Sequence, residues 1–297
     1  MREIPPALQE ALDCGATTLA RCWLVTRRDG VSLGFTDHDK ALSFDGQDYE
    51  PESGFTSSAI ETVTGLSVDS HTVSGALRSD RIAENDIQKG LYAAAEVELY
   101  LVNWLDTSTR LLLSRGQIGE IRRSGQSFNA EITGISDALN QPVGRSFLHS
   151  CSCRLGDEKC GIDLDDPDHF GLATVSAPGD GRQITTTDLT SFDEGAFTSG
   201  LLTWTTGLNA GVGGQVKAHL VAGNETFLEL WTTPPLNVAV GDQFTVTAGC
   251  NKTAKMCAER FTNLENFRGF PHIPGDDVVA GYPGTGGTHN GGSLLNR

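Results

Sequence analysis

The segment Cys151-Ser152-Cys153-Arg154-Leu155-Gly156-Asp157-Glu158-Lys159-Cys160-Gly161 places three thiols close together in the sequence. A second pair, Cys250 and Cys257, follows about 90 residues later, so these two places contain five of the seven cysteines. The sequence between them has no cysteine and consists of short runs typical of β-strands. If the two places meet in space, they close the intervening region into a loop anchored at a cluster of thiols.

The composition favours a mostly β protein. The chain has 297 residues, 35 of them glycine, and turn signals recur between short runs of alternating residues. We predict a mainly β, multi-domain protein with small β-barrel or sandwich domains and few short helices. The predicted division is an N-terminal β-rich domain (1–150), a first cysteine segment (151–160), an inserted small barrel or sandwich (161–249), and a C-terminal cysteine segment with a Gly-rich tail (250–297).

Local signals place the individual elements. A short helix is expected within residues 1–13, because Pro5-Pro6 suits a first helical turn. Asp-Gly pairs predict hairpin turns at residues 28–30 and 45–46. Further expectations are a strand over 62–77, a helix over 80–89, a central strand over 95–104 and a strand pair over 110–121 and 127–135. Six strands are expected at 173–176, 182–186, 200–205, 215–221, 226–231 and 242–247.

The charge and the cysteine content limit the class of protein. A net charge of −16 argues against a sequence-specific DNA or RNA binder, which normally carries a basic surface. No apolar run approaches the roughly 18 residues of a membrane span, and the N-terminus lacks the apolar core of a secretory signal. We therefore expect synthesis in a reducing cytosol, where clustered thiols more often bind metal than form disulfides.

The thiol spacing indicates a metal site without deciding the metal. Four thiolates complete either a tetrahedral zinc site or a four-iron cluster. The spacings Cys151-x8-Cys160 and Cys250-x6-Cys257 are wider than the usual knuckles of structural zinc sites, which favours a larger cluster. Zinc and simply buried cysteines remain open on spacing alone.

A second candidate site is Asp37-His38-Asp39, two acids around one histidine. Such a group can bind a metal or transfer protons. The alternative is a tight turn whose carboxylates accept backbone amides. We favour the turn, because no further cluster of His or acidic residues occurs nearby in the sequence.

Three motifs resemble a known family. They are Arg21-Cys-Trp-Leu-Val-Thr-Arg-Arg-Asp-Gly-Val-Ser-Leu-Gly-Phe-Thr-Asp-His-Asp39, then Cys151-x3-Leu155-Gly-Asp-Glu-Lys-Cys160-Gly-Ile-Asp-Leu164, and finally Cys250-x6-Cys257-x3-Phe261-x-Asn263-x2-Asn266-Phe267-x-Gly269-Phe270-Pro271-x2-Pro274-Gly275. Together they span most of the chain. The sequence resembles the baseplate hub (tail-tip) proteins of long-tailed phages and gene transfer agents, a family that includes the lambda tail-tip protein L.

The resemblance implies a structural protein rather than an enzyme. It implies a ring-forming homotrimer around the tail axis, made in the bacterial cytoplasm and built into the baseplate of a phage-like particle. The implied partners are a distal tail protein and a tail-tip or fibre (receptor-binding) protein, with a tail peptidase as a further candidate. DNA would only pass through the channel during ejection.

The resemblance also implies a four-iron–four-sulfur cluster, with zinc as the second choice. The ligands carried over by motif position are Cys151, Cys160, Cys250 and Cys257. Cys151 is chosen because the family's cysteine stands four residues before the Leu155-Gly-Asp motif. Cys153 departs from the family pattern and is the alternative ligand. The competing hypotheses are a metal-dependent cell-wall hydrolase using Asp37, His38 and Asp39, and a free zinc or redox protein.

Overall fold

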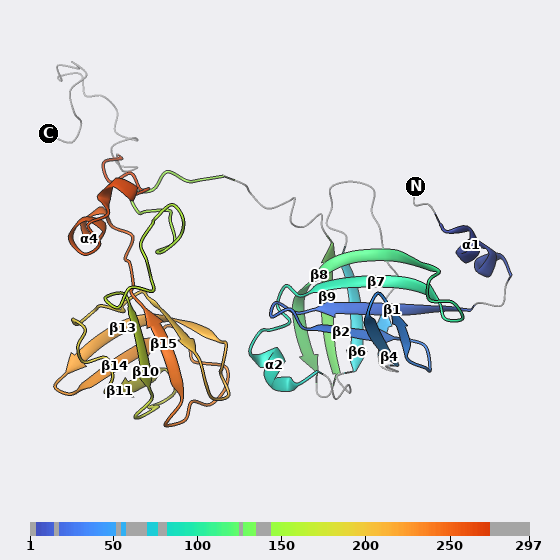
Figure 1. The fold of residues 1–297 in the computed structure, drawn as a ribbon, viewed down its shortest axis with the longest axis horizontal. Coiled ribbons are helices and arrows are strands. Elements are labelled where there is room, and N and C mark those ends of the chain that lie inside the picture. The colour runs from blue at the N-terminus through green and yellow to red at the C-terminus, as the bar shows by residue number, and fades with distance from the viewer. Residues whose placement is uncertain are drawn as a thin grey trace, which may run out of the picture. The chain divides into compact units, whose positions relative to one another are not determined.

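The computed structural model describes residues 4–14, 18–51, 55–57, 70–76, 82–124, 127–134 and 144–273. The chain divides into two compact units, Met1–Val143 and Gly144–Arg297. Strands dominate both units and the helices are few and short (Figure 1), which confirms the predicted mainly β fold class. Within the described ranges, no helix is long and apolar enough to cross a membrane.

The first unit contains a nine-stranded sheet with the strand order β3-β4-β2-β1-β7-β8-β9-β6-β5. Neighbouring strands are antiparallel, except for the parallel pair β2 and β4. The elements are α1 (Pro6–Asp13), β1 (Leu19–Thr26), β2 (Ser32–Thr36), β3 (Leu42–Phe44), β4 (Gln47–Pro51), β5 (Phe55–Ser57), β6 (Ser70–Ala76), α2 (Glu84–Gln88), β7 (Glu96–Asn103), β8 (Arg110–Ser124) and β9 (Ser127–Gly134).

Both predicted Asp-Gly hairpins are confirmed. Between β1 and β2, the amide of Arg27 donates to the carbonyl of Val31 at 2.9 Å, and Gly30 has φ +85°. Between β3 and β4, Asp45 and Gly46 both have positive φ, as a two-residue hairpin turn of the primed type requires. These turns depend on backbone conformations that asparagine, aspartate and glycine tolerate, and the sequence therefore reveals them directly.

Other boundaries differ from the prediction. Of the strand predicted over 62–77, the structure describes β6, which begins at Ser70. Residues 58–69 lie outside the described residues. The helix predicted over 80–89 begins only at Glu84, because Ala83 has an extended backbone with ψ 135°. Strand β5 was not predicted.

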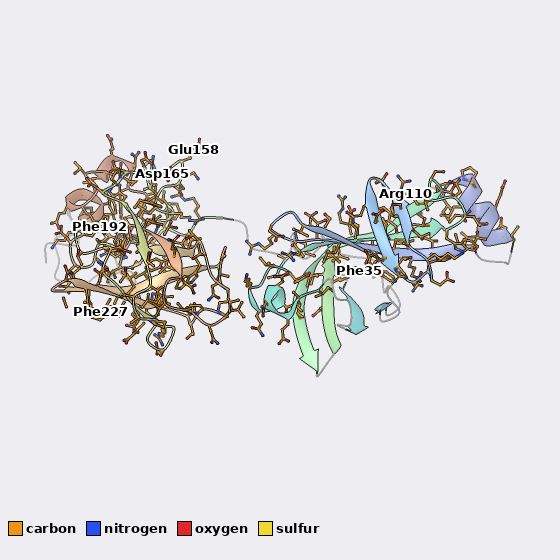
Figure 2. All side chains as sticks on the ribbon, turned by 60° about the horizontal axis from the view of Figure 1, so that its bottom comes forward. Phe35, Arg110, Glu158, Asp165, Phe192 and Phe227 are labelled. Atoms are coloured by element: carbon orange, nitrogen blue, oxygen red, sulfur yellow. The ribbon has the colours of Figure 1, made fainter. Side chains whose placement is uncertain are left out.

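Strand β1 shows why the sheet is apolar on both faces. Trp23 and Val25 belong to one buried cluster, whereas Ala20 and Cys22 belong to another. Alternate residues of a strand point to opposite faces, so the two clusters lie on opposite sides of the sheet. Cys22 is fully buried, and burial raises its pKa to about 11. It therefore behaves as a small buried hydrophobic residue, as predicted. Phe35 of the adjacent strand β2 is labelled in Figure 2.

The second unit contains the six strands that the sequence predicts. They are β10 (Phe170–Thr174), β11 (Gln183–Thr186), β12 (Leu201–Trp204), β13 (Gly213–Ala222), β14 (Glu225–Leu230) and β15 (Gln243–Thr247), in the order β10-β15-β12-β13-β14-β11. The first strand begins earlier than predicted.

The sheet of the second unit closes on itself. Just after β10, the amide of Ser176 donates to the carbonyl of Thr185 on β11, and Ala177 forms a β-bridge with the same residue. The two ends of the sheet therefore meet, and the sheet closes as a small barrel.

The barrel core is built from the inward residues of these strands, with Trp204 and Phe244 in edge contact at 5.6 Å. After β15 the chain forms the short helix α4 (Ala254–Glu259) and the 3-10 turn η1 (Leu264–Asn266). Neither was predicted from sequence. These segments and residues 144–168 lie at one end of the barrel (Figure 1).

Candidate metal centre

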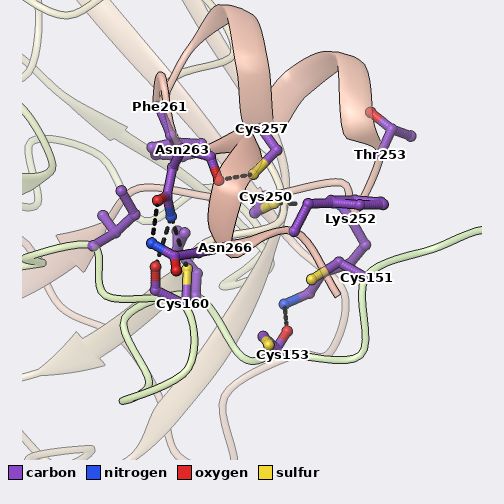
Figure 3. Close-up of a pocket in the computed structure, with 13 residues that line it drawn as sticks. Cys151, Cys153, Cys160, Cys250, Lys252, Thr253, Cys257, Phe261, Asn263 and Asn266 are labelled. Atoms are coloured by element: carbon purple, nitrogen blue, oxygen red, sulfur yellow. Dashed lines mark hydrogen bonds between the residues drawn. The ribbon is translucent and has the colours of Figure 1, made fainter. Parts of the chain in front are cut away.

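The structure brings both cysteine segments together. Five thiols line one cavity in the second unit (Figure 3), from Cys151, Cys153, Cys160, Cys250 and Cys257. The cysteines outside this group lie in the first unit, where Cys14 is exposed and Cys22 is buried. The sequence leaves open whether the two segments meet in space, and in the fold they do meet.

Asp157 shapes the first segment. Its carboxylate accepts the amide of Arg154 at 2.9 Å and the amide of Cys160 at 2.7 Å. Backbone donors, with Cys160 the strongest, hold the pKa of Asp157 below its usual value. Gly156 and Gly161 have positive φ, so the backbone can reverse twice around this carboxylate. The Leu-Gly-Asp motif is therefore a loop that sets the position of Cys160.

The second segment presents its two thiols from a loop and from a helix. Cys250 lies three residues after the end of β15, and Cys257 is the buried residue of α4. The hydroxyl of Thr253 accepts the amide of Met256 at 3.2 Å and caps the N-terminus of this helix. Lys252, just before the cap, has φ +64°. The chain thus reverses direction between the two cysteines, which allows both to face the same cavity.

Hydrogen bonds join the two segments across about 100 residues of sequence. The amide of Cys151 donates to the carbonyl of Lys252 at 2.8 Å, and the Lys252 ammonium donates to the carbonyl of Cys153. On the other side of the cavity, Asn263 Nδ2 donates to the carbonyl of Cys160 at 2.6 Å. The cavity is therefore supported by polar contacts of its own, independent of any bound metal.

The sulfur atoms receive N–H donors of the kind that surround thiolate-bound metals. Lys252 N–H points at Cys250 Sγ and Arg268 N–H at Cys151 Sγ, each at 3.4 Å. The side-chain amide of Asn263 lies 3.9 Å from Cys160 Sγ. Outer-shell hydrogen bonds of this type orient the ligands and tune the metal. The donor set and its surroundings fit a metal–thiolate group.

The thiols of the cavity influence one another electrostatically. Burial raises the pKa of Cys257, and the negative charges of Cys250, Cys151 and Cys160 raise it further. Burial also raises the pKa of Cys153, followed by the influence of its neighbour Cys151. Cys257 thus interacts with cysteines of both segments, and Cys153 interacts with Cys151 and Cys160 of its own segment.

The present spacing is not that of a closed single-ion site. Among the residues that the structure describes, no three His, Cys, Asp or Glu side chains are grouped so as to share one metal ion. The cavity has a volume of about 20 Å³, which is room for about one water molecule. A multi-iron cluster would require the thiols to turn outward. All except Cys257 lie on loops, outside the strands of the barrel.

Asp37, His38 and Asp39 lie in the first unit and have the contacts of a turn. Asp37 accepts the amide of Arg21 at 2.7 Å, and His38 Nδ1 accepts the amide of Lys40 at 3.0 Å. The side chain of Asp39 is 82% exposed. The carboxylate of Asp37 and the ring of His38 are thus engaged by backbone donors, as the turn interpretation expects.

Sequence reasoning missed the supporting residues. Asn263 and Asn266 stood in the third motif without a role, and Thr253 carries a recognisable helix-capping signal. The backbone donors of Lys252 and Arg268 leave no trace in the sequence, because every non-proline residue has an amide.

Comparisons with known proteins agree with this architecture. Residues 5–163 match a family model described as "Baseplate hub protein, N-terminal attachment domain". Residues 195–277 match one described as "Phage conserved hypothetical protein BR0599". A search of the curated proteins found no match.

A solved structure is similar over nearly the whole chain. It is a chain of the "Virion of native gene transfer agent (GTA) particle", with 40% sequence identity and a TM-score of 0.88. The similarity covers 98% of this chain and 100% of that chain. The sequence resemblance is thereby confirmed, and the protein belongs to the phage baseplate hub family.

Proposed function

We propose that this protein is a structural component of the baseplate of a phage-like tail or gene transfer agent particle. Its family membership and its similarity to a gene transfer agent virion chain over 98% of its length support this role. The two β units suit a protein that presents rigid surfaces to neighbours. Under this proposal it has no catalytic function, and Asp37, His38 and Asp39 stabilise a turn.

We further propose that Cys151, Cys160, Cys250 and Cys257 hold a four-iron–four-sulfur cluster. The observation that carries this is the convergence of two distant cysteine segments on one cavity with N–H donors aimed at three of the sulfurs. Cys153 lies at this cavity as a neighbour of Cys151. Zinc is the second choice of metal.

The cluster would supply a crosslink. Its ligands flank the whole barrel, so it would close a loop of about 100 residues, which the chain-entropy model values at a few kcal/mol. Metal–thiolate bonding adds to that figure. The chain's own residues position the thiols through Asp157, Thr253 and Asn263, and the crosslink keeps the C-terminal segments on the end of the barrel.

The same proposal includes the assembly. The hub would form a homotrimer around the tail axis, between a distal tail protein and a host-facing tip or fibre protein, with a tail peptidase as a further candidate partner. DNA would pass through the central channel. The net charge of −16 supports this, because an acidic channel wall repels DNA and prevents it from adhering.

Metal analysis of protein purified anaerobically tests the cluster. We expect iron and acid-labile sulfide in equal amounts, with absorption at about 400 nm. Cys151→Ser should remove most of the iron, whereas Cys153→Ser should retain it, and Cys14→Ser is the matched control in the first unit. A colourless wild-type protein containing one zinc per chain would refute the iron–sulfur assignment. Loss of iron in Cys153→Ser alone would reassign the fourth ligand.

A further inference from the structure

We infer that a groove beside the thiol cavity is the route by which small anions reach the cluster of thiols, with Cys250 as the first thiol that they meet. The groove has a volume of about 440 Å³. One wall comes from the first cysteine segment and its continuation, through Arg154, Leu155 and Leu164. The second cysteine segment contributes Cys250 and Lys252 to the lining.

The floor of the groove is the end of the barrel. Ser199, Gly200 and Leu201 line it at the start of β12, and Gln215 and Thr247 line it from β13 and β15. Thr247 and Gln215 lie on strands whose backbone bonds are already made within the sheet. The sheet therefore holds these two lining residues in place.

The charge of the groove is opposite to that of the chain. Its charged lining residues are Arg154 and Lys252, in a protein with a net charge of −16. Asp157 lies outside the groove lining; its carboxylate accepts the amides of Arg154 and Cys160, and its negative charge also acts on Lys252. A concave surface lined by cations raises the local concentration of anions.

The groove and the thiol cavity share lining residues. Leu155, Cys250 and Lys252 line both, so the groove adjoins one edge of the cavity. Cys250 is half-buried, whereas Cys153, Cys160 and Cys257 are at most 9% exposed. Cys151 is also half-buried but lines only the thiol cavity. Access through the groove therefore selects Cys250.

The consequence for a cluster rests on the proposed function. If the cluster forms, hydrosulfide entering during assembly and small anionic oxidants attacking later would both arrive beside Cys250. Access to the thiol itself does not depend on any metal. The two proposals can accordingly fail separately.

Paired alkylation of the full-length, metal-free chain tests the access route. Iodoacetate is an anion and iodoacetamide is neutral, and both react alike: the thiolate sulfur forms a bond to the methylene carbon while iodide leaves with the bonding electron pair. Because both reagents attack the same thiolate, its protonation cancels in the ratio of the two rates. Peptide mass spectrometry gives this ratio for each cysteine, with Cys14 as the exposed reference and Cys151 as the half-buried one.

We expect Cys250 to react faster than Cys257 and to show the highest iodoacetate-to-iodoacetamide ratio in the second unit. Neutralising one cation, as in Arg154→Gln, should lower that ratio about twofold, and Arg154→Glu about fourfold. Lys159→Gln, on the same loop but outside the groove, is the matched control. Lys252→Gln serves as a second variant, checked for folding because the Lys252 ammonium also contacts Cys153.

Two results would overturn the inference. One is alkylation of Cys250 at the rate of the buried thiols Cys153, Cys160 and Cys257. The other is an iodoacetate-to-iodoacetamide ratio at Cys250 that does not change in Arg154→Glu, or that changes by the same factor as the ratio at Cys151. If the wild type shows the expected ratio yet contains no iron when made anaerobically, the groove assignment stands and only the proposed cluster falls.

Discussion

Asn263 donates a hydrogen bond from its side-chain amide to the carbonyl oxygen of Cys160, at 2.6 Å and across 103 residues of sequence. Its own carbonyl lies 3.2 Å from Cys257 Sγ, and its side-chain oxygen accepts Asn266 Nδ2 at 2.6 Å. One buried asparagine thus contacts a cysteine from each segment. Its position makes it the polar centre of the contact between them.

Replacing Asn263 should loosen the proposed metal centre. Asn263→Leu removes the donor and leaves the Cys160 carbonyl unsatisfied, which we expect to lower the free energy of unfolding by about 1–3 kcal/mol. Iron content after anaerobic purification should fall in parallel. Chemical denaturation and metal analysis measure the two effects. Asn237→Leu, at an exposed position of the same unit, is the control, and equal stability in both variants would contradict the assigned role.

The helix that carries Cys257 depends on one cap. Thr253→Ala removes the acceptor for the Met256 amide and should destabilise the second unit by about 1 kcal/mol. Thr253→Ser keeps a hydroxyl and should restore most of the loss. Thermal unfolding of the three proteins checks this, and a Ser variant as weak as the Ala variant would show that the cap does not matter.

Arg260 fastens the C-terminal segment to the barrel. Its guanidinium donates to the carbonyl of Gly249 at 3.1 Å and to the carbonyl of Ala196, and it lies over the ring of Phe261. Arg260→Met should reduce the free energy of unfolding by about 1.5–3 kcal/mol, because two carbonyls lose a charged donor. Lys255→Met, at an exposed position of the adjacent helix α4, should change it little. Similar losses in both variants would argue against this role.

His219 should make the barrel sensitive to acid. The ring is 1% exposed, and the backbone of Asp193 lies near it without satisfying either ring nitrogen. Burial, then the charge of Arg260, lowers its pKa below 6.5. The unfolded chain therefore binds a proton at this histidine more readily than the folded chain does. The free energy of unfolding should consequently be highest above pH 6.5 and should decline as the pH falls below that value.

Equilibrium unfolding between about pH 5 and 7.5 measures this dependence, since histidine in the unfolded chain titrates in that range. His219→Phe should flatten the curve below pH 6.5, because the replacement cannot bind a proton. His272→Gln removes an exposed histidine and should leave the curve unchanged. An identical slope in wild type and His219→Phe would exclude His219 as the cause.

Much of the local structure could be predicted because its causes are local. The hairpin turns follow from Asp-Gly pairs with positive φ, and all six barrel strands follow from runs of alternating residues between turn signals. Helix α4 escaped prediction because it spans only Ala254–Glu259, too short to show an apolar period. Its capping residue Thr253 was the available signal.

The sequence by itself determined the family, the mainly β class and the two segments in which the cysteines cluster, because motif residues, turn residues and strand alternation are all properties of neighbouring positions. Only the tertiary structure decided that both cysteine segments face one cavity, that Asn263 bridges them, and that Arg154 and Lys252 share a groove with Cys250. These contacts join residues about 100 positions apart. They exist because the barrel closes between the two segments and brings its ends together, a condition that no local pattern encodes.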